Sequence, residues 1–113
     1  MRLRDDRGAV TVEAALALSA VVVAVVLCLG ALLAASTQVR CVDAAREAAR
    51  LAARGDYSNA VPAAERVAPP SADIAVRAEG AHIVAVVSAP APLLPLLVLR
   101  AEVVATVEPG ATP

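Results

Sequence analysis

Aromatic residues are nearly absent from this sequence. Of its 113 residues only Tyr57 is aromatic, and there is no tryptophan or phenylalanine. Single-stranded nucleic acids stack on aromatic side chains, and membrane proteins place aromatic belts at the lipid surface, so neither device is available here. The 10 basic residues are all arginine and the net charge is −1, which argues further against a nucleic-acid partner.

Residues that bind metals or form disulfides are equally scarce. His82 is the single histidine, so no metal site is predicted, and nothing indicates a cofactor. On one continuous helix Cys28 and Cys41 would be about 20 Å apart, which excludes an intrachain disulfide. Cys28 is expected to be a small packing residue in the membrane, and Cys41 to lie at the exposed end of the helix. Because no nucleophile–base pair or phosphate loop is visible, the sequence favours a protein that is not an enzyme.

A long apolar segment near the N-terminus dominates what is present. It runs from Ala14 to Ala35 with only Ser19 and Gly30 interrupting it, and no charge occurs from Ala14 through Val39. As a helix, residues 14–39 would be roughly 39 Å long, enough to cross a hydrocarbon core of about 30 Å. The sequence therefore predicts a membrane span at about 14–35.

The residues on either side of this segment extend the predicted helix to 9–54. Glu13 stands at its membrane edge, where a carboxylate is costly unless it has a partner. Beyond the segment the chain is rich in alanine and arginine, both good helix formers, until Gly55 stops it. Arginines recur there every fourth residue and are expected to form a solvated face, with ion pairs three residues apart. These residues are Arg46, Arg50 and Arg54, and the pairs are Asp43–Arg46 and Glu47–Arg50.

The remaining residues, 55–113, predict a small domain. Residues 56–59 form a turn before a short helix at 60–67, which Pro69 and Pro70 end. Alternating or continuous apolar residues predict strands at 73–77, 81–88 and 99–107. A proline-rich loop separates the second strand from the third. Its leucines are expected to plug the domain rather than meet another subunit: Leu93, Leu94, Leu96 and Leu97. The expected fold is α+β: a long N-terminal helix whose distal half covers a three-stranded antiparallel sheet, with a short second helix.

The start of the apolar helix resembles a type III, or prepilin-type, signal. The signal consists of Gly8 followed by a small residue, with Glu13 at the fifth position after Gly8 and a long apolar helix directly beyond. The resemblance implies that a prepilin peptidase cuts between Gly8 and Ala9 and that the helix is kept. Residues 1–8 would then be a basic leader that stays in the cytoplasm, and Gly8 would let an extended chain approach the protease closely.

Leader, signal, apolar helix and Ala/Arg-rich continuation together resemble the TadE-like family. Its members are minor pilins, or pseudopilins, of the tight-adherence (Flp-type) branch of the type IV pilus system. Major Flp pilins are much shorter and usually have Glu-Tyr at the signal, whereas Ala14 follows Glu13 here and a sizeable domain comes after the helix. Family members often carry a proline early in the apolar helix, where this sequence has Ser19.

The resemblance implies a structural subunit that spans the cytoplasmic membrane once, with its N-terminus inside and its domain outside. Its partners would be the membrane, the prepilin peptidase, other pilins and the Tad pilus assembly proteins, and it would remain in the membrane or enter the pilus. In assembly, the amine of Ala9 freed by cleavage would pair with Glu13 of a neighbouring subunit. Such a pair is far less costly in a low dielectric than an isolated carboxylate.

Two alternatives are compatible with the sequence. The chain resembles a secreted domain with a cleavable signal peptide in having a small-x-small site at Ala34–Ser36, but its apolar region exceeds the usual 7–15 residues. A single-pass anchor carrying a small binding or regulatory domain would leave Gly8 and Glu13 unexplained. A mature chain that starts at Ala9, near Thr37 or at Met1 would distinguish the three.

Overall fold

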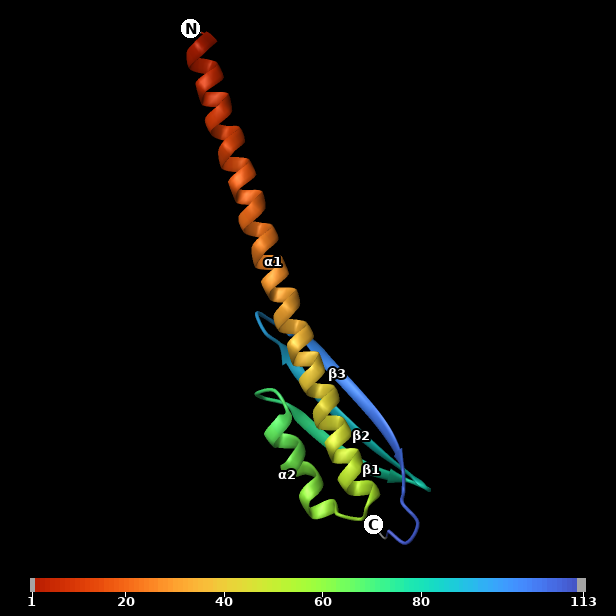
Figure 1. Ribbon diagram of the computed structural model, residues 1–113. Coiled ribbons are helices and arrows are strands. Elements are labelled where there is room, and N and C mark those ends of the chain that lie inside the picture. The colour runs from red at the N-terminus through yellow and green to blue at the C-terminus, as the bar shows by residue number, and fades with distance from the viewer. Residues whose placement is uncertain (1, 112–113) are drawn as a thin grey trace. The chain divides into compact units, whose positions relative to one another are not determined.

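A computed structural model describes the backbone of residues 2–111 and the side chains of residues 6–111. Met1 of the predicted leader and residues 112–113 of the C-terminal tail lie outside the described residues. The chain forms two helices and then three strands: α1 (Arg2–Ala53), α2 (Tyr57–Val67), β1 (Asp73–Glu79), β2 (His82–Ala91) and β3 (Leu94–Thr106) (Figure 1). The predicted α+β class is confirmed. The chain divides into two compact units, residues 1–32 (unit 1) and residues 33–113 (unit 2).

Helix α1 begins earlier than the sequence predicted. The predicted start at Ala9 is wrong, because the helix already includes Arg2 to Gly8. The leader is rich in good helix formers, and Asp6 is an acidic residue close to the positive end of the helix dipole. A single glycine costs a helix only about 1 kcal/mol relative to alanine, so Gly8 does not interrupt it.

The end of α1 lies where Gly55 predicts it. Gly55 has a φ of 89°, and its N–H donates to the Ala52 carbonyl at 2.9 Å. The next N–H, of Asp56, donates to the Leu51 carbonyl at 3.0 Å. This pair of bonds is a Schellman motif, which satisfies carbonyls that the end of a helix leaves free and requires a left-handed residue.

Helix α2 begins at Tyr57, three residues before the predicted start. Asp56 takes the N-cap position, and its carboxylate accepts a hydrogen bond from the Asn59 amide at 3.0 Å. The segment that the sequence predicted as a turn is therefore the first turn of the helix. Ala60 and Ala64 are buried, and the Ala68 N–H donates to the Ala64 carbonyl at 2.8 Å before two prolines end the helix.

The sheet is antiparallel with the strand order β1-β2-β3. Strand β2, predicted to be central because it is apolar on both faces, is flanked on both sides. His82 lies exposed at the start of β2, as expected for a residue at a strand end. On β3 the alternation is also confirmed: Ala101 and Val103 face the core while Arg100 and Glu102 are exposed.

Strands β2 and β3 extend further than predicted and are joined by a tight turn at Pro92 and Leu93. The sequence predicted that the prolines would break the strands, but they do not. Pro90 lies beyond the last β1–β2 pair and is paired only with Val98, and Pro95 is on an edge strand, where a missing N–H is tolerated. The register shifts between Pro90 and Ala91, which leaves residues 95–97 without partners on β2.

The core of unit 2 consists almost entirely of alanine. Among the described residues, the exceptions to alanine in the buried apolar set are Cys41, Ile83, Val84 and Val87. The alanine face of α1 (Ala44, Ala45, Ala48, Ala49, Ala52 and Ala53) packs on β2, which confirms that the distal half of the long helix covers the sheet. Alanine loses no side-chain entropy on burial, so a thin core of this kind is stabilised by close approach of helix and sheet rather than by large side chains.

The expectations about Cys41 and about the leucines of the β2–β3 turn are wrong. Cys41 was expected at an exposed end of the helix, but it is fully buried, because it lies on the same face of α1 as the alanines. The leucines of the β2–β3 turn were expected to plug the domain, but they are exposed, from 49% for Leu97 to 99% for Leu96. Because small alanine side chains fill the space between helix and sheet, the core has no room for these leucines.

Candidate functional site

The three residues predicted for processing and assembly lie close together on α1 in unit 1. Gly8, Ala9 and Glu13 are all exposed. A Cβ built on Gly8 would meet nothing within 4 Å, so a peptidase can approach this position from the side. Ala9 and Glu13 are four residues apart and share one face of the helix, separated by about 6 Å along its axis.

The Gly8–Ala9 bond is helical in this structure, whereas the sequence led us to expect an extended chain there. The Thr11 hydroxyl donates to the Arg7 carbonyl at 2.9 Å, a bond that supports the same turn. If a peptidase cuts here, as the resemblance implies, it must first unwind this turn. Gly8 is the residue of the turn that contributes least to helix stability, which makes local opening easiest at the predicted cleavage site.

The apolar segment beyond Glu13 is long and apolar enough to cross a membrane. The side chains in residues 14–29 are exposed, including Cys28, so this part of the helix presents apolar groups to its surroundings on every face. The one hydroxyl in the segment, Ser19, donates to the Ala15 carbonyl at 2.8 Å. It therefore needs no other partner in lipid, where an unsatisfied polar group is costly.

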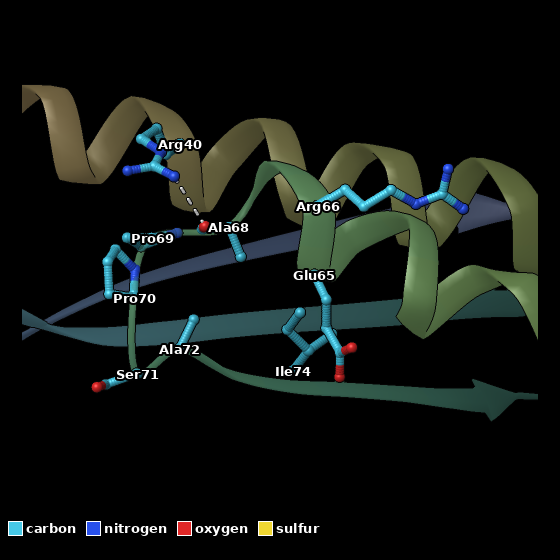
Figure 2. Close-up of a pocket in the computed structure, with 9 residues that line it drawn as sticks. All are labelled: Arg40, Glu65, Arg66, Ala68, Pro69, Pro70, Ser71, Ala72 and Ile74. Atoms are coloured by element: carbon cyan, nitrogen blue, oxygen red, sulfur yellow. Dashed lines mark hydrogen bonds between the residues drawn. The ribbon is translucent and has the colours of Figure 1, made fainter.

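Arg40 ties α1 to α2 within unit 2. Its Nη2 donates to the Ala68 carbonyl at 3.0 Å (Figure 2). Its Nε donates to the Val67 carbonyl at 3.3 Å. These carbonyls close the C-terminal end of α2, where a cation is favoured by the helix dipole. Sequence reasoning did not single out Arg40, because its partners are 27 and 28 residues away in the chain.

A pocket of about 420 Å³ lies beside this arginine. Its walls come from α1, the end of α2, the turn at Pro69–Pro70 and the start of β1, with Glu65 beside Ile74 on the side away from Arg40 (Figure 2). Because the guanidinium of Arg40 is already bonded to two carbonyls, it serves as a structural cap. The pocket holds no nucleophile with an adjacent base, so its lining does not suggest a reaction.

Charged side chains elsewhere in unit 2 form surface pairs. Glu47 and Arg50, one of the two predicted pairs, approach to 2.6 Å, while Asp43 and Arg46 are not among the ion pairs of the described residues. The hydrogen bond from Arg50 lowers the pKa of the Glu47 carboxyl below its ordinary value. Arg46, Arg50 and Arg54 are exposed, which confirms the solvated arginine face.

The buried thiol of Cys41 behaves differently from the surface groups. Burial raises its pKa above the ordinary 9.0, and the opposing effect of Arg40 is smaller. A thiol reacts as its thiolate, so a buried thiol with a raised pKa is unreactive while unit 2 is folded. Among the side chains of residues 6–111, no group of three or more histidine, cysteine, aspartate or glutamate residues could hold a metal ion.

One relative is clearly similar to this chain. The protein named Apoptosis inhibitor Rv3655c, from Mycobacterium tuberculosis, is 50% identical to it over 100 residues, which is 88% of this chain and 80% of the relative. This chain belongs to the Rv3655c family. No family model matches the sequence, and no solved structure matches it.

Membership of the Rv3655c family concerns both units of the chain. Unit 2 comprises residues 33–113, so a match over 100 residues must also include part of unit 1. The relationship therefore does not rest on the alanine-rich helix or on the small sheet alone.

Proposed function

We propose that this chain is a TadE-like minor pilin, a membrane-inserted structural subunit that takes part in assembly of a tight-adherence, type IV-related pilus. One observation supports it above all: Gly8 and Glu13 lie exposed at the start of an apolar helix that runs on into a folded domain. A cut after Gly8 removes a charged leader and keeps the helix, which is what a pilin requires. The proposal assigns no catalytic role to any residue.

Glu13 provides the physical reason for assembly. In the membrane an isolated carboxylate is costly, and the amine of Ala9, created by cleavage, is the nearest group of opposite charge that the mature chain would have. Helices that pack with a stagger can place the amine of one subunit against Glu13 of the next. The proposed orientation, with the N-terminus inside and unit 2 outside, follows from the same resemblance.

The N-terminus of the mature protein tests the proposal directly. We expect mass spectrometry of the chain purified from its native membrane to show a start at Ala9. A start at Met1 would leave a single-pass anchor with a binding or regulatory domain, and a start near Thr37 would indicate a secreted domain. Either result would contradict a role as a pilin.

The variant Glu13→Ala tests the assembly role. We expect it to be inserted and cleaved normally but to fail to co-purify with partner pilins, because removing half of a desolvated pair leaves an amine uncompensated at a cost of about 3–5 kcal/mol. Glu13→Asp, with its shorter reach, should be intermediate. Asp6→Ala is the matched control, since it removes a carboxylate from the leader that cleavage discards. Normal co-purification and piliation in Glu13→Ala would refute the pairing.

A second candidate function comes from the name of the relative, which calls it an apoptosis inhibitor. It is favoured by one structural observation: the packed core of unit 2 begins at Thr37 and Cys41, just beyond the small-x-small site at Ala34–Ser36. A chain cut after Ser36 would keep that core and be released as a small domain. Caspase activity in cells exposed to residues 37–113, compared with cells exposed to the Ile83→Ala form of the same fragment, would test this candidate.

A further inference from the structure

The turn between β2 and β3 presents an apolar surface that nothing in unit 2 covers. Leu93, Leu94, Leu96, Leu97 and Val98 form this surface, called here the leucine tip. Their exposed fractions lie between 49% and 99%. Residues 95–97 have no partners on β2, so this part of the strand bulges from the sheet. Exposed apolar groups gathered in one place mark an interaction site.

The leucine tip lies beside the part of α1 with which unit 2 begins. A pocket of about 430 Å³ is lined by Thr37 together with Pro92, Leu93 and Pro95 of the turn. Thr37 is only two residues past Ala35, where the predicted membrane span ends. Figure 1 shows the β2–β3 turn beside this part of α1, and the opposite ends of the strands beside the end of the helix.

Two charge-free stretches of sequence end at the same level in the structure. In α1 the first charge after the apolar segment is Arg40, and in β3 the first charge after the leucine tip is Arg100. The Gln38 amide donates to the Arg100 carbonyl at 3.1 Å, and Gln38 is about 3 Å along the helix axis from Arg40. At the far end, the Glu108 N–H donates to the Ala53 carbonyl at 2.9 Å.

These two contacts show that β3 runs along α1 in the same direction. The residues that precede Arg100 therefore continue past Gln38 toward Ala35, on the side of the apolar segment. Within unit 2, residues 33–39 of α1 and residues 90–99 around the turn carry no charged side chain. This charge boundary fits a lipid surface, where arginine remains with the headgroups and leucine enters the acyl region.

We propose that the leucine tip inserts into the outer face of the same bilayer that residues 14–35 cross, as a second, interfacial contact beside the span. The inference rests on the membrane insertion required by the proposed function, not on pilus assembly. The depth expected is interfacial, about 5–10 Å, because the backbone of residues 95–97 is unpaired and needs water or headgroups. The contact would restrain unit 2 against the membrane before assembly.

Fluorescence of the full-length chain in phosphatidylethanolamine–phosphatidylglycerol vesicles tests the proposal. In a chain with Cys28→Ala and Cys41→Ala, an environment-sensitive dye is attached at Leu96→Cys, at Val104→Cys or at Val22→Cys. Val104 is the matched control, since it is 58% exposed on the same strand beyond Arg100. At low protein-to-lipid ratio, we expect the Leu96→Cys label to be blue-shifted, quenched by doxyl-labelled lipid and shielded from iodide, whereas the Val104→Cys label loses its emission to iodide.

The outcomes separate this inference from the proposed function. If the Val22→Cys label is shielded and the Leu96→Cys label is open to iodide, the inference fails while membrane insertion stands. If Leu96→Cys becomes shielded only at high protein-to-lipid ratio and is not quenched by doxyl lipid, another subunit covers the leucine tip, and the inference is again overturned. If iodide reaches Val22→Cys as well, the chain is not inserted and both proposals fail.

Discussion

Ile83 is the residue whose truncation should test the alanine core most severely. Its side chain is 0% exposed and packs against Ala52, Ala53 and Ala60. Replacing it with alanine removes three carbon atoms and leaves a cavity. The buried alanines around it have no side-chain torsions with which to refill that space. Only partly buried neighbours such as Leu51 and Val76 can move toward it, so we expect most of the cavity to persist.

The expected cost follows from this lack of relaxation. Truncation of a buried isoleucine to alanine typically costs about 2–5 kcal/mol, with the larger values where the site cannot collapse. We expect about 4 kcal/mol for Ile83→Ala, which is close to a thousandfold in the unfolding equilibrium. Ile83→Val should cost about 1 kcal/mol. Val104→Ala, at an exposed position, should change stability by less than about 0.5 kcal/mol.

The buried thiol provides the assay. Cys41 belongs to a different part of the core from Ile83, so its reaction with a thiol reagent reports opening of unit 2 as a whole. The chain would carry Cys28→Ala and be held in detergent micelles. When closing is faster than labelling, the labelling rate follows the opening equilibrium.

Ile83→Ala should therefore raise the Cys41 labelling rate by about a thousandfold. A rise of less than about tenfold, with the Val104→Ala control unchanged, would refute the reasoning. It would mean that the helix and sheet close the cavity despite their alanine contact, or that unit 2 does not open as one cooperative unit.

Three further predictions concern the surface and the signal. Gly8→Val should block cleavage by crowding the scissile bond without disturbing the helix, while Gly30→Val, also in open space, should be processed normally, as the mass of the mature chain would show. Arg50 lowers the pKa of Glu47, so the Glu47–Arg50 pair stabilises the fold above the ordinary carboxyl value of 4.5, and this stabilisation is lost as the pH falls through the lowered pKa. Glu47→Gln should remove this part of the acid dependence of stability, which thermal unfolding would show as at most about 0.5 kcal/mol. In a chain without native cysteines, Val104→Cys should react with a membrane-impermeant thiol reagent in intact spheroplasts, and labelling only after permeabilisation would reverse the proposed orientation.

The spacing of apolar residues and the positions of helix-ending residues were sufficient to predict most of the fold. The charge-free segment and the alanine–arginine stretch predict the long helix, because helix formation depends on local propensity and Gly55 supplies the left-handed residue that ends it. Alternation predicts β1 and β3, and a continuous apolar run predicts β2. The start of α1 was missed because residues 1–8 were interpreted as a charged leader outside the helix, although their glycine costs a helix only about 1 kcal/mol.

The proline-rich stretch shows where local rules fail. Pro90 and Pro95 are compatible with strands because Pro90 lies beyond the pairing with β1 and Pro95 lies on an edge. Neither fact can be read from the sequence, because pairing partners are set by the whole sheet. The same holds for the leucines beside them, which sequence hydrophobicity alone would place in the core.

The sequence by itself determined the apolar helix and the number and type of the elements in the small domain, since each depends on residues near one another in the chain. Only the tertiary structure decided which groups meet across the chain. Burial of Cys41, capping of α2 by Arg40 and the common level of Arg40 and Arg100 all depend on how closely an alanine-faced helix lies on the sheet. Because the helix and the sheet lie this close together, Cys41 is buried and the leucines are exposed.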